Sequence, residues 1–115
     1  MKLLLAIALM LTPTTAPSVS AQAYCLGGIF NDIGVTASYT AGAHDEFITV
    51  KAVLNGARTS LGRQVFVRRH ETYTVSADLG QHDAPNGVRV RWSGFSTQRS
   101  LPWAIVWRTP SLSCR

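Results

Sequence analysis

The chain contains two cysteines, Cys25 and Cys114, and their positions constrain its fold more than any other feature. Cys114 is the next-to-last of 115 residues, and Cys25 follows an apolar leader. Two thiols in an exported chain favour a single disulfide, which requires its Cα atoms to lie about 5.5 Å apart. The folded domain is therefore expected to begin and end at the same place. A disulfide that closes a loop of this length stabilises the folded state by up to ~4–5 kcal/mol in the chain-entropy model.

The first 23 residues have the pattern of a secretory signal peptide. A single basic residue, Lys2, precedes an apolar run over 3–11, which is too short to span a bilayer. An Ala-x-Ala triplet ends at Ala23, after which we predict cleavage. Tyr24 stands before Cys25, where a lipoprotein needs a small residue. The sequence therefore predicts a secreted or periplasmic protein that is not a lipoprotein and has no transmembrane segment after cleavage.

Residues 24–115 show the alternation of apolar and polar side chains that is typical of β-strands, without a helical period. The clearest segment is 71–79, in which apolar residues alternate with Thr, Ser and Asp. The segments Asn55-Gly56 and 85–87 (Pro-Asn-Gly) predict tight turns. The predicted strands cover residues 33–39, 47–54, 64–69, 71–79, 88–92 and 103–107.

Six to seven short antiparallel strands in one domain over 24–115 predict an all-β fold, namely a small immunoglobulin-like β-sandwich. A small β-barrel is the alternative. The segment 103–107 (WAIVW) is apolar on both faces, so we expect a buried strand there. Its residues Trp103 and Trp107 are expected to join Trp92 in the core rather than to form a carbohydrate-stacking platform.

Arginine dominates the charge of the predicted mature chain, which has ten basic and six acidic side chains. Guanidinium groups bind carboxylates, phosphates and sulfates with two parallel hydrogen bonds. Arg89 and Arg91 alternate with apolar residues and should project to one face of a strand. Arg68 or Arg69 is expected to extend that face if the strands pair. These four arginines predict binding of an acidic protein, polysaccharide or surface, and an ordinary polar face is the alternative.

Every histidine is followed by an acidic residue, as His44, His70 and His82 all show. Neutral imidazoles bind zinc or copper, and neighbouring carboxylates orient them. An exported metal-binding protein that uses these three histidines is therefore an alternative function. The wide spacing along the chain argues against it, because metal motifs depend on close spacing on one element.

No catalytic motif is present. The chain lacks Gly-x-Ser-x-Gly and a glycine-rich phosphate loop, and Asp45 and Glu46 are adjacent, so they point apart in an extended chain. We therefore expect a non-catalytic binding domain without a cofactor, whose partner is a macromolecule or surface other than nucleic acid. A secreted hydrolase inhibitor is a third possibility, although the Trp-Arg-Tyr turn and second disulfide of amylase-inhibitor sandwiches are missing. The sequence leaves the oligomeric state open.

Overall fold

A computed structural model describes residues 16–96 and 103–114 of the chain. These residues form antiparallel β-strands and no helix, which confirms the predicted all-β class. The strands are β1 (Ser18–Cys25), β2 (Ile33–Thr40), β3 (Glu46–Leu54), β4 (Ala57–Ser60), β5 (Val65–Val67), β6 (Thr72–Asp78), β7 (Asp83–Ala84), β8 (Arg89–Ser96), β9 (Trp103–Arg108) and β10 (Leu112–Ser113).

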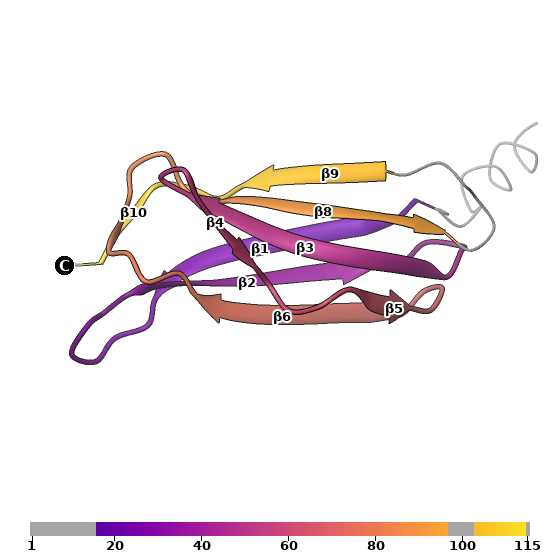
Figure 1. Cartoon of the computed structure of the whole chain (residues 1–115), viewed down its shortest axis with the longest axis horizontal. Coiled ribbons are helices and arrows are strands. Elements are labelled where there is room, and N and C mark those ends of the chain that lie inside the picture. The colour runs from indigo at the N-terminus through magenta and orange to yellow at the C-terminus, as the bar shows by residue number, and fades with distance from the viewer. Residues whose placement is uncertain (1–15, 97–102, 115) are drawn as a thin grey trace, which may run out of the picture.

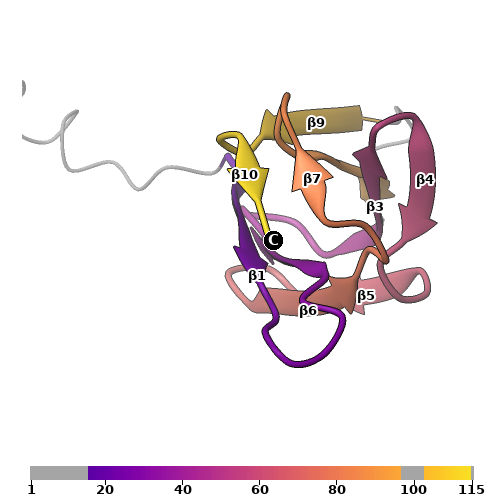
Figure 2. The same ribbon diagram turned by 90° about the vertical axis from the view of Figure 1, so that its left-hand side faces the viewer.

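Two sheets pack face to face in the sandwich (Figures 1 and 2). Sheet A has the order β1-β2-β6, and sheet B has the order β4-β3-β8-β9, with β5 also paired to β3. The chain crosses from sheet A to sheet B after β2, returns for β6 and crosses again to β8. This pattern of crossings belongs to immunoglobulin-like sandwiches. The short strands β7 and β10 pair at one end, near the C-terminus (Figure 2).

The core lies between the sheets, where alternate residues of each strand turn inward. Val35 and Tyr39 of β2 are fully buried, as are Ile48 of β3 and Trp92 of β8. Strand β6 shows the predicted alternation, with its tyrosine, valine and alanine half-buried and its threonines and serine exposed. The outward hydroxyls of sheet A form hydrogen-bonded pairs across strands, namely Thr36–Ser76, Ser38–Thr74 and Thr40–Thr72.

The predicted hairpin turn at Asn55-Gly56 joins β3 to β4. Both residues have positive φ, 50° and 84°, as a two-residue hairpin of this type requires. Leu54 and Ala57 are paired on either side of the turn. The turn therefore sets the register of β4 against β3, and with it the position of every side chain on β4.

The prediction of a buried strand over 103–107 is wrong in part, because Trp103 and Ile105 pack against the core but the rest of the strand is exposed. These residues form β9, which is the outermost described strand of sheet B and is hydrogen-bonded to a neighbouring strand, β8, on one side only. Val106 is 55% exposed and Trp107 is 46% exposed, whereas Trp92 on the neighbouring strand β8 is fully buried. An apolar run does not distinguish a central strand from an edge strand, and here the edge position leaves part of the run in solvent.

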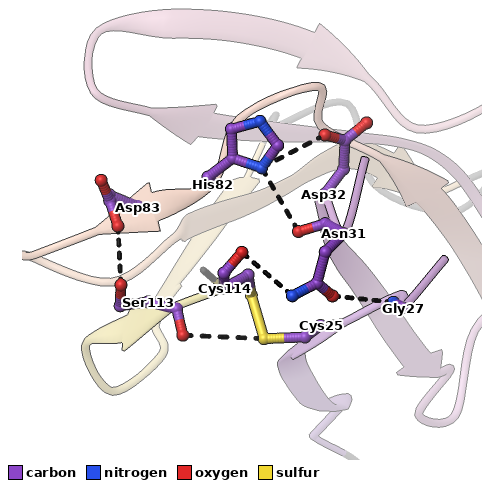
Figure 3. Close-up of a disulfide and its surroundings, with 8 residues drawn as sticks. All are labelled: Cys25, Gly27, Asn31, Asp32, His82, Asp83, Ser113 and Cys114. Carbon is purple, nitrogen blue, oxygen red and sulfur yellow. Dashed lines mark hydrogen bonds and ion pairs between the residues drawn. A yellow bond between two sulfur atoms is a disulfide. The ribbon is translucent and has the colours of Figure 1, made fainter. Parts of the chain in front are cut away.

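The predicted disulfide is confirmed. It joins Cys25, at the end of β1, to Cys114, directly after β10, with Cα atoms 5.5 Å apart. The side chain of Asn31 reinforces the junction, because its Nδ2 donates to the carbonyl oxygen of Cys114 at 3.0 Å and its Oδ1 accepts from the Gly27 amide (Figure 3). The β1–β2 loop is thus fastened to the end of the chain.

Strand β1 begins upstream of the predicted cleavage point. Residues Ser18–Ala23 account for six of the eight positions at which β1 pairs with β2. Val19, Ala21 and Ala23 are half-buried against the core. Cleavage after Ala23 stays a prediction, and it would remove this part of sheet A.

Candidate functional site: a basic face on sheet B

The outer face of sheet B gathers five cationic side chains. Val50 and Ala52 of β3 and Val90 and Trp92 of β8 are buried. Lys51 on β3 and both arginines of β8 alternate with them, so they turn outward and are exposed. The flanking strands β4 and β9 each add one exposed arginine to the same rows. We call this set the basic face; it consists of Lys51, Arg58, Arg89, Arg91 and Arg108.

Like charges stand opposite one another within the basic face. Lys51 is paired with Arg91, and Arg89 is paired with Arg108. Residues directly opposite in antiparallel strands have Cβ atoms about 4.5–5.5 Å apart, and like charges there destabilise a sheet. The Arg108 guanidinium has one hydrogen-bond partner nearby, because it donates to the carbonyl oxygen of Asn86 at 2.9 Å. A bound anion would therefore reduce the repulsion between the closely spaced cations of this face.

Among residues 16–96 and 103–114, no carboxylate lies on the outer face of sheet B beside these charges. The only acidic residue on the strands of sheet B, Glu46, turns inward and is buried. Sheet A offers a contrast, because its strands carry no cation and its outer face is built largely from paired hydroxyls. The five other acidic residues lie in loops or on β6 and β7, and they are Asp32, Asp45, Glu71, Asp78 and Asp83.

Arg68 and Arg69 do not extend the basic face. They follow β5, which pairs with β3 only at the start of that strand. There they line an open depression of about 420 Å³ together with Ala43, Asp45 and Glu71. The backbone amide of Arg69 donates to a carboxylate oxygen of Asp45 at 2.8 Å. The predicted group of four arginines is thus divided between two places, and only Arg89 and Arg91 lie within an uncompensated cluster.

The same outer face carries an aromatic stripe that the sequence reasoning missed. Phe47 on β3 is paired with Phe66 on β5 and with Phe95 on β8. Its ring centroid lies 4.9 Å from that of Phe66 and 5.4 Å from that of Phe95. Phe66 and Phe95 are 47% and 43% exposed. The outward position of Phe47 could have been predicted from the alternation of residues 47–54, which puts Phe47 on the same face as Thr49 and Lys51.

A glycine brings the strands together at this stripe. Gly94 precedes Phe95 on β8, and a Cβ atom built on Gly94 would collide with the carbonyl oxygen of Phe47. Any larger residue would therefore push β8 away from β3. The close approach helps to hold the rings of Phe47 and Phe95 in contact.

The three histidines do not converge. His44 and His70 lie in neighbouring loops at the end of the sandwich away from the disulfide, and the His70 amide donates to the carbonyl oxygens of Ala41 and Gly42. His82 lies at the disulfide end, with its Nδ1 3.6 Å from a carboxylate oxygen of Asp32 (Figure 3). Within residues 16–96 and 103–114, no group of three His, Cys, Asp or Glu side chains has the arrangement of a metal site.

A polar cluster lies inside the sandwich, at the end away from the disulfide. Tyr39 stacks on Trp103, with centroids 5.4 Å apart, and the Trp103 indole donates to Glu46 at 3.0 Å. The Tyr39 hydroxyl is buried without a hydrogen-bond partner among the described residues. Burial, and secondarily the negative charge of Glu46, raises the pKa of Tyr39 above its ordinary range.

Replacing Tyr39 by Phe is expected to leave the free energy of unfolding at pH 7 unchanged or to raise it by up to ~1 kcal/mol. The reason is that the substitution removes a buried, unpartnered hydroxyl. The raised pKa predicts that the wild type loses stability as the pH rises above about 10, where the unfolded chain ionises and the folded phenol does not. Tyr39→Phe should reduce that loss.

Denaturant unfolding at pH 7 and pH 11 measures both effects. Tyr73→Phe, on β6, is the matched control for the loss of a tyrosine hydroxyl. A Tyr39→Phe variant that is more than ~1 kcal/mol less stable at pH 7 would show that the hydroxyl has a stabilising partner.

The fold and its surface define a class: a small antiparallel β-sandwich, closed by one disulfide, with a cationic outer face. The residues that the structure describes contain no helix long and apolar enough to cross a bilayer. In sequence comparisons, the chain matched no protein-family model and no curated protein.

Proposed function

We propose that this protein is an exported, non-catalytic binding domain that captures an acidic macromolecule through the basic face. The observation that carries the proposal is the pairing of Lys51 with Arg91 and of Arg89 with Arg108, on a surface where the described part of the chain places no carboxylate. Side-chain guanidinium groups at this spacing can bind neighbouring carboxylates, sulfates or phosphates of one chain.

Electrostatics alone would make such binding sensitive to salt. Exposed charges interact over about 8–10 Å at physiological ionic strength, and the cations of the basic face lie in two neighbouring rows across four strands. A polyanion can therefore contact several of them at once. Export of the chain, predicted from its first 23 residues, would bring the face to acidic proteins and polysaccharides outside the cytoplasm.

Charge reversal tests the proposal. We expect Arg89→Glu/Arg91→Glu to weaken binding to polygalacturonate and to polyphosphate by about tenfold or more at ~0.15 M salt. The fold should be retained, because the new carboxylates would stand opposite Arg108 and Lys51 and form pairs of opposite charge. Binding is measured by biolayer interferometry and folding by thermal unfolding.

The matched control is Arg68→Glu/Arg69→Glu, which makes the same change of charge beside Asp45 and Glu71. We expect this variant to lose much less affinity than the first. Equal losses for the two variants would show that only net charge matters, and unchanged binding of Arg89→Glu/Arg91→Glu would refute the assignment of the basic face.

A further inference from the structure

The aromatic stripe and the basic face occupy the same side of sheet B. Outward positions recur every two residues along a strand, so the outer face consists of successive rows. The first row holds Phe66, Phe47 and Phe95, and the second holds Thr49, Ser93 and Ala104. The third and fourth rows hold the cations, beginning with Lys51 and Arg91.

From these rows we infer that the ligand of the proposed binding face is an acidic polysaccharide, whose sugar rings lie on the aromatic stripe while its anionic groups reach the cations. The inference rests on the proposed function and specifies the ligand class. Phe47 and Lys51 are four residues apart on β3, which corresponds to ~13 Å along the strand. A single extended chain running along β3 would therefore touch both regions.

The chemistry of the rows matches the parts of such a chain. The rings of Phe66 and Phe95 are nearly half exposed and offer an apolar surface to the C–H face of a pyranose ring. Thr49 and Ser93 are directly paired in the next row, and their hydroxyls can exchange hydrogen bonds with sugar hydroxyls. The cations beyond them match carboxylate or sulfate groups.

The aromatic contacts favour sugar over nucleic acid as the occupant. Single-stranded nucleic acids stack successive bases on separate aromatic side chains. Here the central ring, Phe47, contacts both of the others, with centroid separations of 4.9 Å to Phe66 and 5.4 Å to Phe95. They form one continuous strip across the strands and leave no space for a base between two rings.

The experiment compares two polyanions, polygalacturonate and polyphosphate. Both are negatively charged, but only polygalacturonate contains sugar rings. We expect Phe66→Ala/Phe95→Ala to weaken polygalacturonate binding by about fivefold to tenfold and to leave polyphosphate binding within about twofold. Phe66→Tyr/Phe95→Tyr, which keeps the rings, should retain binding to both polymers. Phe30→Ala is the matched control, because Phe30 is 75% exposed but lies in the β1–β2 loop at the disulfide end.

The outcomes separate this inference from the proposed function. If Phe66→Ala/Phe95→Ala binds both polymers like the wild type, the acidic-polysaccharide assignment is overturned while anion binding stands. Tighter wild-type binding to single-stranded DNA or to vesicles of phosphatidylglycerol than to polygalacturonate overturns it in the same way. Thermal unfolding checks that the tyrosine variant is folded. If the folded variant loses polygalacturonate binding as fully as the alanine variant, ring stacking is refuted. Failure of the wild type to bind any polyanion refutes both proposals.

Discussion

The variant Cys25→Ala/Cys114→Ala is expected to lose up to ~4–5 kcal/mol of stability, which is the largest effect we predict. The disulfide links residues 89 positions apart. Without it the unfolded chain gains the conformational entropy of the open loop, which stabilises the unfolded state relative to the fold. A domain of this size is stable by only about 5–10 kcal/mol. The melting temperature should therefore fall by about 15–30 °C.

Differential scanning calorimetry of the wild type with and without reductant, and of the double variant, measures this effect. Reduction should lower the melting temperature of the wild type to that of the variant. Ser113→Ala is the local control, because it removes a 2.7 Å hydrogen bond to Asp83 beside the junction and leaves the disulfide intact. Equal melting temperatures for oxidised and reduced wild type would contradict the prediction.

Removal of Ser18–Ala23 is expected to be the second most damaging change, at roughly 3 kcal/mol or more. A chain that begins at Tyr24 keeps only two of the eight paired positions of β1. It also loses the half-buried side chains of Val19, Ala21 and Ala23. Strand β2 would then become an open edge, and exposed edges promote pairing with other chains.

Chains that begin at Ala16 and at Tyr24 provide the comparison, with thermal unfolding for stability and sedimentation for self-association. We expect the shorter chain to melt at a lower temperature and to associate more readily. The mass of the protein isolated from its natural source shows which of the two occurs. If both chains are monomeric and equally stable, β1 upstream of Tyr24 makes no contribution to the fold.

Local patterns determined the elements that depend on local geometry. Alternation in residues 71–79 and 88–92 identified two strands and the side of each that faces the core, because successive side chains of a strand point to opposite faces. The Asn55-Gly56 turn was predictable because both of its residues tolerate positive φ. The positions of Cys25 and Cys114 predicted the disulfide that joins the two ends of the domain.

Strand neighbours were not predictable in the same way, and the binding face depends on them. Periodicity placed Arg89 and Arg91 on one side of a strand, but only the sheet order shows that Lys51 and Arg108 stand opposite them. The same order separates Arg68 and Arg69 from this cluster and puts 103–107 at an edge. Sequence determined which way each side chain points, since that follows from the backbone of its own strand. Tertiary structure decided which charges and rings are neighbours, because hydrogen bonding between strands distant in the chain sets their order and register.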